Sequence, residues 1–478
     1  TTHGISNADV SGSSRWKRVY RLQRDNPSGT LASARISFGT QDAGFGDNDI
    51  DGRVIGDYKL LYRVGTSGAF AEVAGAVGVL DVDQNKVTYT IDNADLQTGY
   101  YTLGIPGSNV WYSYLVSGTW DNPDMWTLDP SGTLYINSGG VTPGESDEVV
   151  ILNGKTVTDV TGTKSVAILT IKSGGVLDIE GHTGYSFGTI NGAGTIRLKD
   201  DNFPASTNIT DFASKGKVEF YGDSYVISND YTFFNVDINL DNSANSLVFK
   251  SDLTVQGDLI VESGEMQIGD ATNVSRVIDV NGDLFVQPDG SINVDQTYTG
   301  SNVVHRLEIA GDLTNEGSCV FSDAGGYDPT GSLVDVQVDV RFNSSISDQR
   351  VYLDGPTQFY RIVSDKGVDD NYILDIEASA SANFELIGRN NIGGSGATAE
   401  NLNALGFKAG TVKLNNNIVI PVLFTGTGNF DISETSRLWM NNSQISVPAS
   451  ATTAVVLYGK ILVTGPLADL KIYMRSGL

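Results

Sequence analysis

The chain has 478 residues, of which 55 are glycine and 12 are proline, and it carries a formal charge of −26 from 57 acidic and 31 basic residues. This length exceeds what one ordinary hydrophobic core serves, and the scarcity of proline argues against a disordered Pro/Gly-rich linker protein. The acidic balance disfavours nucleic acid and anionic membranes as partners, because both repel negative charge. No run approaches the roughly 18 consecutive apolar residues of a transmembrane helix, so no membrane-spanning segment is predicted.

Short runs of Val, Ile, Leu, Phe, Tyr and Thr alternate with polar residues along almost the whole chain and end at Gly, Asn, Asp or Ser. Helical periodicity is nearly absent. This pattern is typical of strands and turns, and it predicts an all-β protein. The single cysteine, Cys319, excludes an intramolecular disulfide framework and a cysteine-based metal cluster. Its apolar, alternating neighbours predict a small inward-facing core residue.

Residues 1–105 contain long alternating segments, whose period of two predicts strands with one buried and one solvated face. Roughly eight such strands in about a hundred residues predict an antiparallel β-sandwich of jelly-roll type. The clearest segments are RWKRVYRLQ (15–23), ARISFG (34–39), YKLLYRV (58–64) and KVTYTID (86–92).

An acidic segment within this domain, DNDIDGRVIGD (47–57), resembles the first half of a calcium-binding loop. Alternate carboxylates can converge on one hard cation, and the glycine permits a sharp turn. The twelfth position, however, is a tyrosine and not a bidentate glutamate, and no helices flank the segment. Two interpretations stay open: a Ca²⁺ site with Asp47, Asp49, Asp51 and Asp57 as ligands, or a solvated acidic turn.

Residues 106–145 form a junction that holds Trp111, Trp120 and Trp126 close together in the sequence. Clustered tryptophans of this kind cap the end of a repeat array or join two domains. The alternative is a platform on which the three indole rings stack against a sugar ligand.

From residue 146 onward the chain repeats itself imperfectly. The clearest copies place a glycine at Gly257, Gly282 and Gly311. Their irregular period, with several short strands and Gly/Asn/Asp turns in each copy, predicts a right-handed parallel β-helix, or β-solenoid, over residues 146–478. The alternative is a row of antiparallel sandwiches of about 100 residues each. The copies are VQGDL (255–259), VNGDL (280–284) and IAGDL (309–313).

The corner residues of these repeats carry a further prediction. Glycine is expected to supply a positive φ, and Asp258, Asp283 and Asp312 are interpreted as turn residues that bond their own backbone. A stacked carboxylate ladder that binds Ca²⁺ between rungs is the alternative. The chain lacks the G-G-x-G-x-D nonapeptide that favours calcium binding.

Several segments resemble, in the same order, the repeat regions of very large cell-surface proteins of Bacteroidota. The first contains a G-x-W-x-x-P-x-x-W element and is followed by a strand pair of the P-x-x-x-D-x-V-x-I type. These segments are GTWDNPDMWTLDPSG (118–132), PGESDEVVILNGKTVT (143–158), FFNVDINLDNSANSLVFKSDLTVQGDLIVESGEMQIGD (233–270) and VRFNSSISDQRVYLDGPTQFYRIVSD (340–365).

The resemblance implies export by the type IX secretion system and display on, or release from, the cell surface. Members of the family are adhesin-like proteins of very great length, some of them connected with gliding motility. We therefore expect the native protein to continue beyond Leu478. No compact secretion-signal domain is recognisable after residue 450, which leaves the export route an expectation.

Together these observations predict a non-catalytic, extracellular structural or adhesive protein, with the solenoid as a stalk or spacer. Type IX secretion components, cell-surface components and surface polysaccharide are the expected partners, and Ca²⁺ is the one candidate cofactor. A carbohydrate-binding module is the first alternative, and a β-helix polysaccharide lyase or hydrolase is the second. A hydrolase needs a pair of carboxylates that face each other. Asp200 and Asp201 are adjacent, so on a strand they would point to opposite faces. His182 is the one histidine considered for catalysis, and no paired-aspartate motif lies beside it in the sequence.

Overall fold

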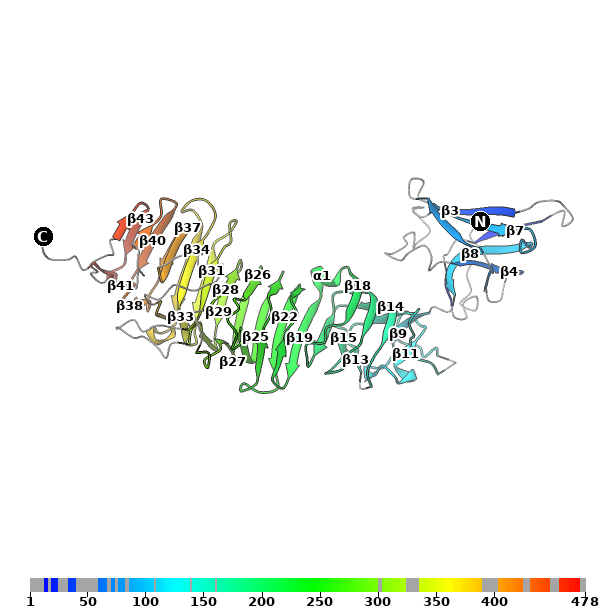
Figure 1. Ribbon diagram of the computed structural model, residues 1–478, viewed down its shortest axis with the longest axis horizontal. Helices are drawn as coiled ribbons and strands as arrows, with labels where there is room; N and C mark the ends of the chain where they lie inside the picture. Colours follow the sequence, from blue (N-terminus) through cyan, green and yellow to red (C-terminus); the bar gives the residue numbers. More distant parts are fainter. Residues whose placement is uncertain are drawn as a thin grey trace. The chain divides into compact units, whose positions relative to one another are not determined.

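The computed structural model describes most of the chain, and nearly all of its secondary structure is strand (Figure 1). The chain forms two compact units, residues 1–177, 183–192 and 204–210 in the first and residues 178–182, 193–203 and 211–478 in the second. The predicted all-β class is confirmed. The described residues are 13–15, 19–24, 33–39, 59–66, 70–73, 76–81, 86–106, 109–137, 140–159, 161–299, 303–323, 335–388, 403–423, 430–447 and 455–472.

Two antiparallel sheets form the N-terminal part of the first unit. One contains β1 (Ser13–Arg15), β2 (Tyr20–Leu22), β4 (Lys59–Arg63), β5 (Ala71–Glu72) and β8 (Gly99–Pro106). The other contains β3 (Ser33–Gly39), β6 (Gly78–Asp81) and β7 (Lys86–Asp92), in the order β3-β7-β6.

The two sheets share one hydrophobic core. Phe38 and Tyr89 from one sheet belong to the same buried cluster as Leu60 and Tyr101 from the other. Burial alternates along β7, as a strand with one solvated face requires. The described strands of this domain are therefore antiparallel, and the β-sandwich with its jelly-roll topology stays a prediction.

The remainder of the first unit is a stack of parallel strands. One sheet contains β9 (Val110–Ser113), β12 (Glu148–Ile151), β14 (Ser165–Ile171), β16 (Ser186–Gly192) and β18 (Ala205–Ile209), with β11 (Trp126–Thr127) antiparallel on β9. A second pairing joins β10 (Ser117–Thr119) to β13 (Thr156–Thr158). Pro123–Met125 forms a 3-10 turn, and the division between the two units falls within β15 (Val176–Asp178).

The parallel stacking begins earlier than the sequence predicts. Strand β9 already pairs in parallel with β12, so the first rung lies within the predicted junction 106–145 and not at residue 146. The rungs that follow are shorter than the Gly-Asp-Leu repeats, since Val149 pairs with Leu169, and Leu169 pairs with Ile190.

In the second unit every pairing between named strands is parallel, and Figure 1 shows the strands stacked side by side from β19 toward β43. The only α-helix among the described residues is one turn, α1 (Phe212–Lys215), and Ser381–Asn383 forms a 3-10 turn. The strands up to β30 are β17 (Thr195–Leu198), β19 (Lys217–Gly222), β20 (Tyr225–Ile227), β21 (Tyr231–Phe233), β22 (Asn235–Leu240), β23 (Ser246–Phe249), β24 (Leu253–Val255), β25 (Leu259–Ile268), β26 (Val277–Val280), β27 (Leu284–Val294), β28 (Val303–Ile309), β29 (Leu313–Asn315) and β30 (Ser318–Val320).

The remaining strands follow the same parallel arrangement. They are β31 (Val336–Phe342), β32 (Gln349–Leu353), β33 (Thr357–Phe359), β34 (Arg361–Asp365), β35 (Ile373–Ala378), β36 (Glu385–Leu386), β37 (Leu405–Leu414), β38 (Val419–Ile420), β39 (Phe430–Ile432), β40 (Ser436–Asn441), β41 (Gln444–Val447), β42 (Val455–Leu457), β43 (Lys460–Thr464) and β44 (Asp469–Ile472).

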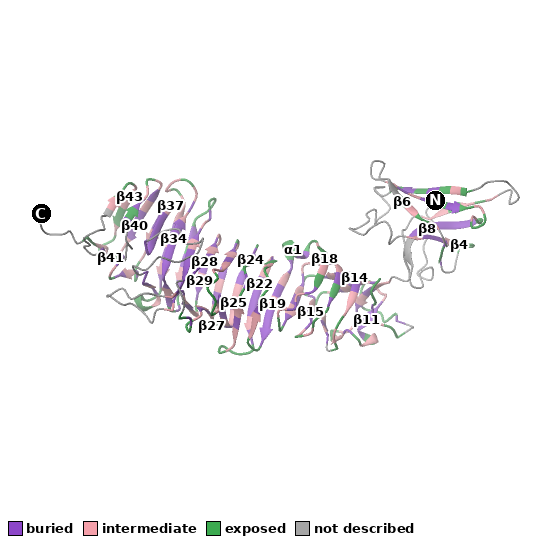
Figure 2. Ribbon diagram, viewed as in Figure 1, coloured by how far each residue is buried: buried purple, intermediate pink, exposed green. Residues whose placement is uncertain are grey.

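The leucine of each Gly-Asp-Leu copy lies in one interior column. Leu259 pairs with Leu284, and Leu284 pairs with Leu313, and the column continues through Val236 on one side and Val351 on the other. All five side chains are fully buried, and Figure 2 shows such buried positions along the stacked strands. Each contributes about 1.5–3 kcal/mol relative to an exposed side chain. The predicted parallel β-solenoid is confirmed, and the row of antiparallel sandwiches is excluded for these residues.

Candidate functional site

The three tryptophans of the junction lie in the interior of the first rungs. Trp111, Trp120 and Trp126 are 2 %, 1 % and 0 % exposed. The Trp120 ring meets the Trp126 ring edge-on, with centroids 5.0 Å apart, and stacks on Phe187 at 6.3 Å. A sugar platform needs exposed ring faces, so this burial argues against the sugar-platform alternative. The role of the tryptophans as a cap or a domain joint stays a prediction.

The indole N–H groups are also engaged within the protein. Trp126 Nε1 donates to the Trp120 carbonyl at 2.7 Å, and Trp111 Nε1 donates to Asp147 Oδ2 at 3.0 Å. Asp147 also accepts from the backbone N–H groups of Asn109 and Gly144. One carboxylate therefore fixes the start of β9, the turn before β12 and an indole, which explains the aspartate in the P-x-x-x-D element.

The repeat aspartates form a ladder, but not with their own backbone. Asp258 Oδ1 accepts from the N–H of Asp283 at 2.9 Å, and Asp283 Oδ1 accepts from the N–H of Asp312 at 2.8 Å. Asn235 precedes them in the same role, and Asp312 closes the row by accepting from the N–H of Arg350 at 2.7 Å. Each side chain thus bonds the next rung, and the local-turn interpretation is wrong. We call Asn235, Asp258, Asp283 and Asp312 the corner ladder.

The same geometry explains the glycines, and it differs from the predicted reason. Gly257, Gly282 and Gly311 are absent from the glycines with positive φ. A Cβ on Gly282 would lie 2.4 Å from Asp258 Oδ1 and 2.5 Å from the Gly257 carbonyl oxygen, and a Cβ on Gly311 would lie 2.4 Å from Asp283 Oδ1. Glycine is needed here because the backbone and the ladder side chain of the preceding rung occupy the space of a side chain.

Neither predicted calcium site gains support from these contacts. The side chains of the corner ladder accept hydrogen bonds from backbone N–H groups. In the described part of the chain, no group of three or more His, Cys, Asp or Glu side chains is arranged to hold a metal ion. Asp47, Asp49, Asp51 and Asp57 lie outside the described residues, so the loop site stays a prediction.

A charged network that the sequence analysis did not single out lies on β28, β31 and β34 of the second unit. Arg306 Nη1 lies 2.9 Å from Glu308 Oε1, and Arg341 Nη1 lies 3.7 Å from the same oxygen. On the next rungs Arg341 pairs with Asp365, and Arg361 pairs with Asp339. The Arg361–Asp339 pair is almost fully buried, with 1 % and 3 % of the side chains exposed.

Two of these pairs, Glu308 with Arg341 and Asp339 with Arg361, follow from the register of the strands. Arg306 and Glu308 on β28 lie opposite Asp339 and Arg341 on β31, so unlike charges face each other across the rungs. Asp279 is the exception, because it lies opposite Glu308. Burial, and then the charge of Glu308, raise the pKa of Asp279. The rung that joins β28 to β31 is longer than the Gly-Asp-Leu repeats before it. Because of this irregular spacing, the sequence did not predict which charged residues lie opposite each other.

Two buried titratable groups lie in the same rungs. His305 is 1 % exposed, and its Nδ1 accepts from the N–H of Arg276 at 3.0 Å. Burial, and then the charge of Arg276, lower the pKa of His305 to about 4. Lys366 is fully buried, its Nζ donates to Gln349 Oε1 at 2.8 Å, and burial lowers its pKa to about 8.

Two of the residues considered for catalysis make hydrogen bonds within the solenoid, His182 through its backbone carbonyl and Asp201 through its carboxylate. The carbonyl of His182 accepts from Asn202 Nδ2 at 2.6 Å. Asp201 accepts from the Ser228 N–H and from the hydroxyl of Tyr231 at 2.9 and 2.8 Å. Cys319 is fully buried and burial raises the pKa of its thiol, which confirms the predicted core position.

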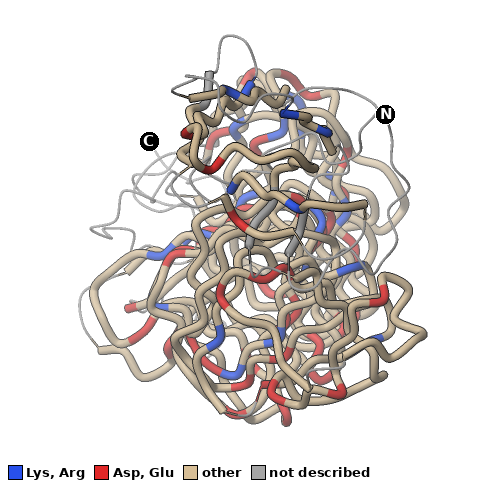
Figure 3. The backbone as a smooth tube through the Cα atoms, turned by 90° about the vertical axis from the view of Figure 1, so that its right-hand side faces the viewer, with Lys and Arg blue, Asp and Glu red and all other residues tan. Residues whose placement is uncertain are grey.

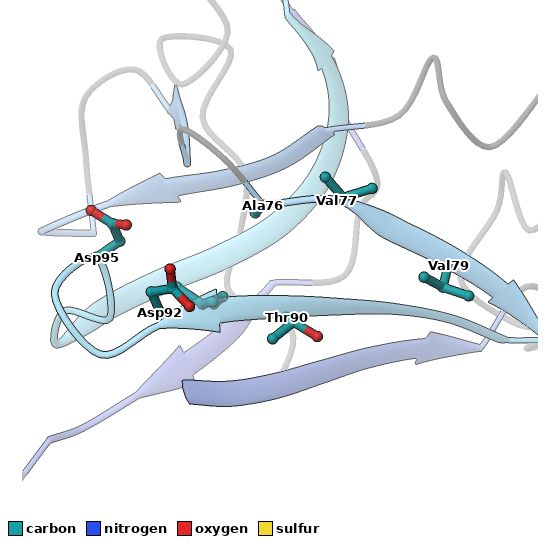
Figure 4. A pocket seen from close by; sticks show the side chains of 7 residues that line it. Ala76, Val77, Val79, Thr90, Asp92 and Asp95 are labelled. Atoms are coloured by element: carbon teal, nitrogen blue, oxygen red, sulfur yellow. The ribbon is translucent and has the colours of Figure 1, made fainter. Parts of the chain in front are cut away.

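A pocket of about 310 Å³ lies on the N-terminal domain (Figure 4). Thr90, Ile91 and Asp92 come from β7 and its end, Val79 comes from β6, and Ala76, Val77 and Asp95 complete the lining. The Asp95 N–H donates to the Asp92 carbonyl at 3.0 Å, which closes the turn that carries both carboxylates.

The pocket was not predicted, because the alternation along β7 predicts only that Thr90 and Asp92 face solvent, and not that other segments form a hollow around them.

Elsewhere acidic and basic positions are interspersed along the chain, as Figure 3 shows. No helix among the described residues is long and apolar enough to span a membrane. No protein-family model, curated protein or solved structure shows significant similarity to the chain.

Proposed function

We propose that the chain is a non-catalytic, extracellular structural or adhesive protein whose solenoid serves as a stalk or spacer at a cell surface. The observation that carries the proposal is the corner ladder, in which Asn235, Asp258, Asp283 and Asp312 each bond the backbone of the following rung. These bonds run between rungs, in addition to the hydrogen bonds of the sheets. They therefore resist separation of the rungs along the stacking direction, which is the load that a stalk bears.

The interior supports the same function. Rungs stack at about 4.8 Å, the spacing of strands in a sheet. Each added rung therefore lengthens the array by a fixed step and adds one buried aliphatic side chain to each interior column. Leu259, Leu284 and Leu313 come from successive rungs of one such column, and each depends on its neighbours for burial. A repeated element that gains its stability from neighbours is suited to span distance.

The surface location rests on the resemblance of the sequence to adhesin-like surface proteins of Bacteroidota exported by the type IX secretion system. The formal charge of −26 fits an exposed, soluble protein, because strong like charge opposes self-association. Surface components and surface polysaccharide are the partners that this location offers.

Protease treatment of intact producing cells tests the location. The protein should be cleaved from intact cells or be recovered from the medium, and a cytoplasmic marker protein should survive the same treatment. Protection of the chain until the cells are lysed would overturn the proposal.

Incubation of the purified chain with neutral and uronate polysaccharides tests the non-catalytic part. We expect no new reducing ends and no unsaturated products. Turnover that is lost in an Asp201→Asn or a His182→Gln variant would establish the enzymatic alternative instead.

A further inference from the structure

The pocket of the N-terminal domain combines exposed apolar side chains with two carboxylates. Val77 and Val79 are 72 % and 65 % exposed, although valine is an apolar residue. The side chains of Asp92 and Asp95 make no hydrogen bond or ion pair with any part of the chain that the structure describes. In the solenoid, by contrast, carboxylates such as Asp283 and Asp339 are bound to donors of neighbouring rungs.

The backbone of the turn that carries the two carboxylates is held by Arg24. Arg24 donates to the Asn93 carbonyl at 3.0 Å, to Asn93 Oδ1 at 2.7 Å and to the Leu96 carbonyl at 3.1 Å. These bonds fix the turn between Asp92 and Asp95 from the side of its backbone. An ordered turn backbone lowers the conformational entropy lost when a ligand binds to its side chains.

The lining selects the chemistry of the ligand. Figure 4 shows the carboxylates of Asp92 and Asp95 toward one end of the pocket and Val77 and Val79 toward the other. A basic side chain has the matching arrangement, a cationic head at the end of an apolar methylene stem. A sugar ring is a poorer match, because sugars stack on aromatic side chains and none lines the pocket.

We propose that this pocket binds an arginine or lysine side chain of a partner protein. The methylene stem lies on Val77 and Val79, and the guanidinium or ammonium group donates to Asp92 and Asp95. The negative charge of the whole chain draws a basic segment toward this surface and raises the rate of encounter. The inference is independent of the stalk function, since a spacer can carry any recognition domain.

The test is fluorescence polarisation of the full chain with a labelled peptide, acetyl-Gly-Gly-Arg-Gly-Gly-amide, and with its citrulline counterpart, which keeps the shape and removes the charge. We expect saturable binding of the arginine peptide, at least about tenfold weaker binding of the citrulline peptide, and a loss of affinity as salt increases. Equal binding of the two peptides would overturn the proposal.

Two matched variants locate the binding. Asp92→Asn combined with Asp95→Asn should weaken binding at least about tenfold, because both acceptors lose their charge. Glu72→Gln combined with Asp289→Asn removes the same charge from exposed positions outside the pocket and should leave binding within about twofold. Equal weakening by both pairs would mean attraction by bulk charge alone and would overturn the site. Binding of glucosamine in preference to the arginine peptide would replace the protein partner by an amino sugar.

Discussion

Two regions of the second unit, the early rungs (residues 235–299) and the later rungs (residues 303–411), are held together by different chemistry. Among the residues that the structure describes, two buried polar side chains lie in the early rungs, Asp237 and Ser251, against thirteen in the later rungs. The early rungs combine an aliphatic interior with the exposed part of the corner ladder. The later rungs add buried ions and amides, including Arg361 and Lys366.

This difference shows that the stability of one solenoid can depend on single side chains to different extents in different rungs. An exposed carboxylate that accepts a backbone N–H gives a modest, water-screened contribution. A buried ion pair contributes little beyond its desolvation cost while intact, but its loss is severe because one charge is left without compensation. The later rungs should therefore respond strongly to single substitutions and to pH, and the early rungs weakly to both.

Removal of one partner of the buried ion pair should give the largest effect. Arg361→Met leaves the Asp339 carboxylate buried without its guanidinium, and we expect a loss of about 3–5 kcal/mol. Hydrogen exchange of the β31 and β34 amides, followed by mass spectrometry, measures it. The double variant Arg361→Met with Asp339→Leu should recover most of the loss; a double variant as unstable as the single one would contradict the account.

Acid should destabilise the later rungs next. The folded-state pKa of His305, about 4, lies below the usual value of 6.5, so the unfolded chain binds more protons between these values. The contribution of neutral His305 is present above pH 6.5 and is lost as pH falls toward 4, by about 3 kcal/mol in total. Exchange of the β28 amides at neutral pH and at a pH near the folded-state pKa measures the change.

His305→Asn provides the matched control, because the Asn Oδ1 can accept from the Arg276 N–H without titrating. The extra exchange of β28 in acid should be much smaller in this variant. The same acid response in both proteins would show that another group is responsible.

The buried Lys366 should act in the opposite pH range. Its folded-state pKa, about 8, lies below the usual 10.5, so the unfolded chain again binds more protons, here between pH 8 and 10.5. Stability should rise as pH increases through this window. Lys366→Met should be more stable than the wild type at neutral pH by about 2 kcal/mol and show no such rise. A destabilised Met variant in denaturant unfolding would contradict this reasoning.

The early rungs should show the smallest effect. Asp283→Ala removes the acceptor for the Asp312 N–H and should cost about 1 kcal/mol. Asp283→Asn keeps an oxygen at the same place, as Asn235 does naturally in this ladder, and should be close to the wild type. Equal losses in the two variants would mean that the charge, and not the acceptor, matters.

The sequence predicted the features that repeat locally. Alternation gave the strands, and the return of Leu259, Leu284 and Leu313 gave the interior column and the parallel stacking. The hydrogen-bond partner of each repeat aspartate was not predictable in this way, because the N–H that it binds lies a full rung further along the chain. Gly and Asp are equally suited to a local turn in which the aspartate bonds its own backbone. The repeat glycine was identified as a corner residue for the wrong reason. A positive φ was expected, whereas glycine is required because the preceding rung leaves no space for a side chain.

Burial was the harder part of the prediction. Trp111, Trp120 and Trp126 are residues that serve equally well as exposed platforms and as core, and only packing decides between them. His305 and Lys366 gave no signal, since polar residues on alternating strands are expected to face solvent. Their placement depends on the register of rungs whose lengths differ from one to the next, as the pairings of β31 with β28 and with β34 show.

Single-molecule pulling of the full chain tests the central claim most directly, because it loads the contacts between rungs as a stalk would. The wild type and Asp283→Asn should unfold rung by rung at similar forces, and Asp283→Ala should release the rungs around β27 at a lower force. Indistinguishable traces for all three proteins would contradict the role of the corner ladder in holding the stalk together.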